Sequence, residues 1–278
     1  MRVFISQPRR SHALEAISEL TAALLQEGHD VHAGPADRAA RRFGPDIVVA
    51  HYEPGRLASA WFARRRNVPC CMLVDTEPRR PPPFFDRMIW RTAHRVIAAS
   101  ATLKDAVVAV GVDANRIDIF PGGAHLEHFL PPPFGPARPA DAIVFGWFGD
   151  STSASTAAQD LALTVIDDAL PRVRVPDVIA GIDIALFPQA SASRLLDCMA
   201  ARRAIVAPAT HEVRDLLEHE HTALLFDPAE GGALLRAAAR LIADPALRTR
   251  LGEAAHAEII RRDLTWRGLA RRVTDVAL

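Results

Sequence analysis

The sequence has little lysine, tyrosine and cysteine. Lys104 is the only lysine among its 33 Lys and Arg residues, and Tyr52 is the only tyrosine. The three cysteines, Cys70, Cys71 and Cys198, have neither the number nor the spacing of a disulfide framework or a metal site. A protein of this composition is expected in a reducing cytoplasm.

The sequence also lacks net charge and long apolar runs. Its formal net charge is zero, so no general field attracts nucleic acid, and a nucleic acid partner is not expected. No stretch approaches the ~18 apolar residues of a membrane span, and the amino-terminal apolar run is too short for a signal peptide. Any membrane contact is expected to be peripheral, at the inner face.

What the sequence does contain is a regular alternation of strands and helices. Short apolar runs predict strands, and runs with apolar residues at i, i+3 and i+4 predict helices between them. The predicted strands of the first half are 2–6, 29–34, 45–51, 69–75, 95–100 and 116–123, and its helices are 11–28, 57–66, 87–94 and 101–111. This alternation predicts a parallel sheet with helical crossovers.

A proline-rich segment, 131–140, separates this half from a second one. Five prolines in ten residues exclude a helix or a central strand, so the segment is expected to be a linker. The alternation then restarts, with strands predicted at 142–149, 163–167, 182–188 and 204–209, and helices near 155–162 and from Ser193. Three further helices, 231–244, 245–262 and 266–278, are expected on the second half, and the last of them can also pack back on the first.

The sequence therefore predicts an α/β protein with two Rossmann-like domains, an amino-terminal one at 1–132 and a carboxy-terminal one at 133–278. Folds of this kind bind ligands at the carboxyl ends of their parallel strands. The expected ligand site is a cleft onto which both sheets open.

Two stretches carry a more specific resemblance. The segment 96–129 resembles the pattern "P-N-G-V-D-x-x-x-F" of the large retaining glycosyltransferase family with two Rossmann domains. Pro121, Gly123 and Phe129 match this pattern, whereas Gly122 replaces its Asn and His125 replaces its Asp.

The segment 182–228 is similar to the donor-binding segment of the same family, and "GWFGDSTSAS" at 146–155 is similar to the strand and loop that open its second domain. The matching residues are Ser193, Leu195, Leu196, Met199, Ala200, Val206, Ala207, Thr222, Leu224 and Leu225. The resemblance implies that this chain moves a sugar, with retention, from a nucleotide-diphosphate donor to a hydroxyl acceptor. Beyond that donor no cofactor is expected.

By this resemblance, the donor diphosphate lies at the amino end of the helix that begins near Ser193. Free helix amides and the positive end of the helix dipole favour an anion there. Arg194 would add a charged donor, and the Asp197 carboxylate would accept hydrogen bonds from the ribose. The expected donor-binding residues are Ser151, Thr152, Ser153, Arg172, Val173, Ser191, Ala192, Ser193, Arg194, Leu195 and Asp197. The alternative is that Arg194 and Asp197 lie on a solvated helix face.

The sequence departs from the family pattern at two places that concern catalysis. Gln189 stands where many relatives have a glutamate near the donor sugar, and it carries no charge. The loop 149–155 supplies hydroxyls and amides where relatives have an Arg and a Lys. The chain has no Asp-x-Asp pair, so the leaving diphosphate is expected to be neutralised by amides, hydroxyls and Arg194 without a metal.

The acceptor is expected on the first domain. Arg9 and Arg10 follow the first strand in place of the family's glycine pair, and they are either acceptor-side groups or solubilising surface charges. After the fourth strand, Asp75 and Glu77 are candidate catalytic carboxylates that accept a proton from a hydroxyl. Thr76 and His51 complete the acceptor-side set, with a purely structural His51 as the alternative.

These observations favour an active, metal-independent glycosyltransferase whose acceptor is a small molecule, a glycan or a lipid-linked sugar. The alternative from another class is a catalytically silent relative that binds a sugar nucleotide or partners an active enzyme. Gln189 and the absent cations favour that alternative, whereas Arg194 and Asp197 oppose it. Two further alternatives are a sugar-nucleotide epimerase and an enzyme that glucosylates nucleic acid.

Overall fold

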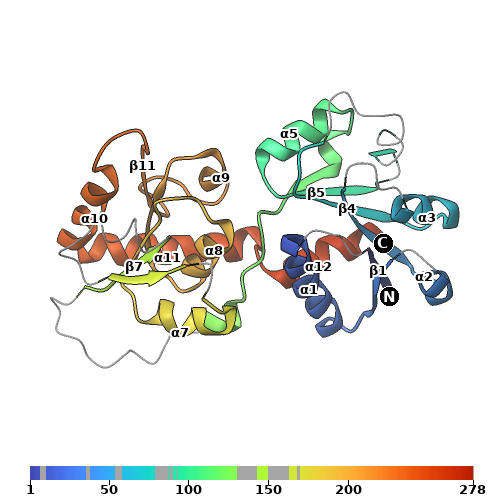
Figure 1. The fold of residues 1–278 in the computed structure, drawn as a ribbon, viewed down its shortest axis with the longest axis horizontal. Helices are drawn as coiled ribbons and strands as arrows, with labels where there is room; N and C mark the ends of the chain where they lie inside the picture. Colours follow the sequence, from blue (N-terminus) through green and yellow to red (C-terminus); the bar gives the residue numbers. More distant parts are fainter. Residues whose placement is uncertain are drawn as a thin grey trace. The chain divides into compact units, whose positions relative to one another are not determined.

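The computed structural model describes residues 1–6, 11–35, 38–53, 58–78, 87, 90–91, 93–129, 143–149, 163–167 and 170–277, with the backbone alone at 11–13, 38–40 and 172. The chain forms two compact units (Figure 1). The first contains Met1–Gly123 and Trp266–Leu278, and the second contains Ala124–Thr265. The predicted boundary at 132/133 and the predicted linker lie outside the described residues.

The first unit is a parallel sheet with helical connections. Its six strands, in the order β2-β1-β3-β4-β5-β6, are β1 (Arg2–Ser6), β2 (Asp30–Gly34), β3 (Ile47–His51), β4 (Cys70–Val74), β5 (Arg95–Ala98) and β6 (Ile117–Ile119). Its helices are α1 (Ser11–Gln26), α2 (Arg38–Phe43), α3 (Ala58–Arg66), α5 (Ala101–Ala109) and α12 (Trp266–Thr274), with 3-10 turns η1 (Ala114–Arg116) and η4 (Asp275–Ala277).

Apolar residues cover both faces of this sheet. Cys70 and Cys71 point to opposite faces of β4, as neighbours on a strand must, and neither is exposed. Burial raises the pKa of the Cys70 thiol to about 12, so this thiol stays protonated at neutral pH. A sheet that is covered on both faces is what helical crossovers between parallel strands produce.

The second unit repeats this plan. Its five parallel strands, in the order β11-β10-β9-β7-β8, are β7 (Phe145–Phe148), β8 (Leu163–Ile166), β9 (Ile184–Leu186), β10 (Ala204–Pro208) and β11 (Leu224–Phe226). Its helices are α7 (Val175–Ala180), α8 (Ala192–Ala200), α9 (His211–Arg214), α10 (Ala233–Ala243) and α11 (Pro245–Arg262), with η2 (Leu126–Phe129) and η3 (Arg172–Arg174). The prediction of two Rossmann-like α/β sheets is confirmed.

The last helix, α12, packs with the first unit instead of the second. It lies beside α1 (Figure 1), and it buries Trp266, Leu269 and Val273. Its apolar stripe is visible in the sequence, but the stripe does not say which sheet it covers. Gly123 makes the packing possible, because a Cβ at this position would lie 2.6 Å from the Trp266 ring.

Within the described residues, no helix combines the length and the apolar character that crossing a membrane requires.

Candidate functional site

A pocket of about 360 Å³ opens at the carboxyl ends of three strands of the second unit. Its lining comes from the residues that follow β7, β8 and β9 and from the first turn of α8: Phe148, Gly149, Ile166, Asp167, Pro188, Gln189, Ala190, Ser191 and Arg194. In this sheet β7 lies between β8 and β9. The chain passes from β7 to β8 on one side and then crosses over to β9 on the other, so the pocket lies where the strand order reverses. This is where open α/β sheets bind their ligands.

The amino end of α8 faces this pocket. Ser191 is the N-cap residue, and its carbonyl accepts the first helical hydrogen bond from the Leu195 amide at 2.9 Å. The Ser191 side chain makes no capping hydrogen bond. The first-turn amides of a helix have no hydrogen-bond partner within the helix, and an N-cap side chain usually accepts from one of them. The Ser191 side chain does not do so here. The pocket therefore has backbone donors and a positive dipole end at its wall.

Arg194 places a guanidinium at the same wall. The residue is only 8% exposed, and its Nη2 donates to the Leu170 carbonyl oxygen at 3.4 Å. Its Nη1 lies 3.8 Å from Oδ2 of Asp197, beyond hydrogen-bond distance, and makes no hydrogen bond within the described residues. A buried cation with an unused donor at a pocket wall is suited to bind an anion.

Asp197 lies behind Arg194, one turn further into the helix. It is 5% exposed and does not line the pocket. The alternative of a solvated helix face is therefore wrong for both residues. Burial and the Asp197 carboxylate together raise the pKa of the Cys198 thiol, which stays neutral beside them.

The carboxyl end of α8 is fixed by α11. Gly252 of α11 approaches so closely that a Cβ there would lie 2.2 Å from the carbonyl oxygen of Arg202. His256 bonds the Ala200 carbonyl through Nδ1 at 3.0 Å, and its Nε2 lies 3.2 Å from Nη2 of Arg202. Arg202 also pairs with Glu253 at 3.1 Å. These contacts hold α8 from the end opposite the pocket.

The remaining residues predicted on the donor side differ in exposure and in their distance from the pocket. Gln189 is exposed and lines the pocket, whereas the Leu195 side chain is buried and its amide is bonded within the helix. Val173, in η3, is 81% exposed. Ser193 is exposed in the first turn of α8, beside Ala192. Ser151, Thr152, Ser153 and the side chain of Arg172 lie outside the described residues.

Outside the loop 149–155, five pocket residues were missed in the sequence: Phe148, Ile166, Asp167, Pro188 and Ala190. Each lies at the end of a predicted strand or closely follows one. Because the carboxyl ends of parallel strands meet at one edge of a sheet, this position alone was a usable signal.

In the first unit, His51 and Asp75 come together at the carboxyl ends of β3 and β4. Nε2 of His51 lies 3.0 Å from Oδ2 of Asp75, and the Thr76 hydroxyl donates to Oδ1 of Asp75 at 2.8 Å. The His51 side chain is 5% exposed and that of Asp75 is 25% exposed, so the carboxylate is the accessible member. Glu77 is exposed two residues on, and Arg9 and Arg10 lie outside the described residues.

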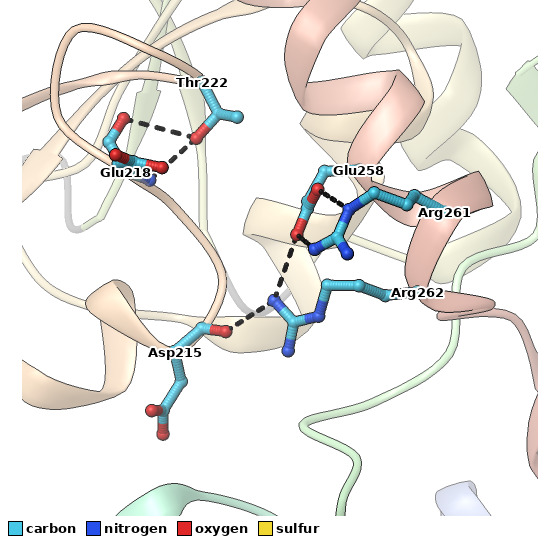
Figure 2. A network of polar contacts seen from close by, with 6 residues as sticks. All are labelled: Asp215, Glu218, Thr222, Glu258, Arg261 and Arg262. Atoms are coloured by element: carbon cyan, nitrogen blue, oxygen red, sulfur yellow. Dashed lines mark hydrogen bonds and ion pairs between the residues drawn. The ribbon is translucent and has the colours of Figure 1, made fainter.

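A histidine-rich stretch at 211–221 contains α9 and the turns that follow it, and Figure 2 shows its residues Asp215 and Glu218. The Thr222 hydroxyl accepts from the Glu218 amide at 2.8 Å and donates to the Glu218 carbonyl at 3.3 Å. Nearby, Arg262 of α11 donates to the Asp215 carbonyl at 2.7 Å. Thr222 therefore has a structural reason to occupy its position in the family pattern.

Two family models match the chain, one over most of the first unit and one that runs from the second unit through α12. Residues 6–123 match the glycosyl transferase 4-like domain, and residues 146–275 match the glycosyl transferase-like domain. No curated protein sequence matches the chain.

Solved structures with this fold include several glycosyltransferases. HepE from Anabaena, in complex with UDP, is 13% identical with a TM-score of 0.67, over 99% of this chain and 98% of that chain. Sucrose-phosphate synthase from Thermosynechococcus elongatus is 13% identical with a TM-score of 0.68 over the same shares. A glycosyltransferase from Rickettsia africae is 11% identical with a TM-score of 0.73, over 99% of this chain and 97% of that chain.

Proposed function

The chain belongs to the group 1-like glycosyltransferases, and we propose that it transfers a sugar from a nucleotide-diphosphate donor to a hydroxyl acceptor, with retention and without a metal. The pocket at the amino end of α8 is the observation that carries this proposal. HepE was solved in complex with UDP and with UDP and glucose, which supports a nucleotide sugar as the donor class.

The α8 wall of the pocket offers what a diphosphate requires. A diphosphate brings two or more negative charges, and the first-turn amides of α8, which the Ser191 side chain does not cap, supply donors, while the buried Arg194 guanidinium supplies positive charge. These groups stabilise the charge that develops on the leaving diphosphate, which is the usual role of a metal. We propose that the buried Asp197 carboxylate, 3.8 Å from the Arg194 guanidinium, holds that guanidinium at the pocket wall.

We propose that the hydroxyl acceptor binds at the carboxylate of Asp75. His51 and Thr76 each contact one of its two oxygens, which fixes the carboxylate plane. A carboxylate has about four lone-pair positions, so the exposed side of Asp75 can also accept from an acceptor hydroxyl. Asp75 thus orients the attacking oxygen, and His51 acts as a positioning residue.

A thermal-shift panel of UDP, GDP, ADP and TDP sugars tests the donor site. A ligand at 100 times its dissociation constant adds about 2.7 kcal/mol to the free energy of unfolding. We expect one nucleotide to raise the Tm, Arg194→Ala and Asp197→Ala to abolish that shift, and Arg194→Lys to restore part of it. Arg203→Ala is the matched control, because Arg203 lies at the other end of α8 and bonds the Ala180 carbonyl.

Product analysis tests the reaction. We expect a glycoside with the anomeric configuration of the donor, formed equally well in EDTA. A shift that persists unchanged in Arg194→Ala rules out the α8 donor site, and an inverted product rules out retention.

Gln189 favours a second candidate function, a catalytically silent binder of a sugar nucleotide. Its uncharged amide lines the pocket where many relatives place a glutamate. The silent binder is indicated if a nucleotide raises the Tm but the protein neither transfers nor hydrolyses the sugar. In that case we expect the Gln189→Glu variant to gain turnover.

A further inference from the structure

A cluster of three potential metal ligands lies where the chain enters the second unit. His125, Glu127 and His128 belong to the segment around η2, and one ligand atom of each lies within 4.8 Å of the others. In the residues that the structure describes, this is the only group of three such side chains that meets this distance. His125 replaces the Asp of the family pattern, and none of the three residues lines the pocket at α8.

The local backbone brings the two histidines together. The His128 amide donates to the His125 carbonyl at 3.1 Å, which closes a 3-10 turn. Residues i and i+3 are eclipsed on such a turn, so the two imidazole rings stack with centroids 4.7 Å apart and planes at 21°. Oε1 of Glu127 lies 3.5 Å from Nδ1 of His125 and supplies an oxygen to the same side.

The turn that carries the cluster is anchored to the second unit. The Ala124 amide donates to the Leu264 carbonyl at 2.9 Å, and Phe129 at the end of η2 is buried. The turn packs against α7 and α8, and in Figure 1 its green ribbon lies beside α7. Ligands on a fixed turn lose less freedom on binding than ligands on a loose chain.

We propose that His125, Glu127 and His128 bind Zn²⁺, with water as the fourth ligand. Two imidazole nitrogens and a carboxylate oxygen match the ligand set of open zinc sites, whereas Mg²⁺ and Ca²⁺ prefer oxygen alone. Ligand atoms on a tetrahedral Zn²⁺ at ~2.1 Å lie about 3.4 Å apart, so ligand atoms that now lie within 4.8 Å of one another must close by up to ~1.4 Å. The Glu127 side chain is 59% exposed and His128 is exposed, so both are able to rotate and the ion has access from solvent.

The other histidine-rich stretch provides an internal contrast. His219 already accepts the Leu225 amide through Nδ1 at 3.0 Å, and His211 lies exposed in α9. His211→Ala therefore removes one exposed imidazole without touching the cluster. It is the matched control for loss of a surface histidine.

The experiment is a Zn²⁺ titration of the full chain against a chromophoric chelator, without nucleotide, and with the metal content measured after gel filtration. We expect one Zn²⁺ per chain, a dissociation constant below about 10 µM and no competition from millimolar Mg²⁺. His125→Ala, His128→Ala and Glu127→Gln should each weaken binding at least ~10-fold, and His211→Ala should leave it unchanged. Far-UV circular dichroism checks that each variant is folded.

A dissociation constant above 10 µM for the parent chain overturns the proposal. So does binding that is unchanged in His128→Ala, or binding that His211→Ala weakens equally. The outcome is independent of the proposed donor site, because His128→Ala should keep the nucleotide-induced shift and Arg194→Ala should keep zinc binding.

Discussion

The two units share one strand order but carry different chemistry at the carboxyl ends of their sheets. In each, the first strand of the unit lies beside the second on one side and the third on the other. At this edge the second unit has a helix start and a buried cation, whereas the first unit has a carboxylate held by an imidazole and a hydroxyl.

This difference shows how one topology serves two tasks. The strand order fixes where polar groups gather, and the residues that end each strand decide their charge. A positive edge suits a diphosphate, and a carboxylate edge suits a hydroxyl. A few side chains at the strand ends therefore decide which unit suits the donor and which suits the acceptor.

The largest effect on stability is expected from a substitution that disturbs the packing of α11 against the carboxyl end of α8. Gly252→Ala places a Cβ against the Arg202 backbone carbonyl, which cannot move aside as a flexible side chain would. We expect a loss of about 3 kcal/mol in the free energy of unfolding, measured by urea denaturation, and a weaker nucleotide shift because α8 moves. Gly231→Ala is the control, since nothing lies within 4 Å of its added Cβ. Equal stability of the two variants would contradict the role given to α11.

The roles of the two units can be separated by a substitution at the carboxyl ends of the strands of the first unit alone. Asp75→Asn removes the negative charge that orients the acceptor, so we expect turnover to fall about 100-fold while the nucleotide-induced Tm shift stays unchanged. Asp118→Asn is the matched control, because Asp118 pairs with Arg95 in the same sheet at 2.8 Å, away from Asp75. A loss of the nucleotide shift in Asp75→Asn would break the division of labour between the units.

Most of the fold could be predicted because the spacing of apolar residues and the residues that begin and end helices and strands are local properties of the sequence. β1 and α11 begin and end where the sequence predicts. Short elements were missed: α7, α9 and β11 have three to six residues, too few for a period to show. The placement of α12 depends on the fit of Trp266 against Gly123, a tertiary contact that no local pattern encodes.

The site divides in the same way. The start of α8 and the place of Arg194 in its first turn were predictable from the resemblance and from the chemistry of helix ends. The pairing of His51 with Asp75 was not, because it depends on two strands lying side by side in register. Asp167 and Phe148 lie at the ends of predicted strands, so their place at the ligand-binding edge was predictable, whereas the sharing of one pocket depends on the strand order, which the sequence left open.

A smaller effect tests the α11 contact through pH. Burial, followed by the charge of Arg202, lowers the pKa of His256, which binds the Ala200 carbonyl. Above pH ~6.5 the imidazole is neutral in both the folded and unfolded states, and its contribution is complete. As the pH falls below that value the unfolded chain takes up the proton first, so stability decreases until the lowered pKa of the folded state is passed. Urea titrations at several pH values should show this slope, and His256→Gln should reduce it.

The smallest effect is expected at the exposed end of α11, within the network of Figure 2. Arg261 pairs with Glu258 and lowers the pKa of that carboxyl, yet the Arg261 side chain is 70% exposed, so water and salt screen the pair. Arg261→Ala should leave the urea midpoint within experimental error. Arg262→Ala should lower it measurably, because Arg262 is 25% exposed and its bond to the Asp215 carbonyl ties α11 to the turn after α9. If the two variants lose the same free energy of unfolding, the exposed fraction of the arginine side chain does not determine how much its contacts stabilise the fold. The charged surface of α11 then contributes as much as its buried contacts do.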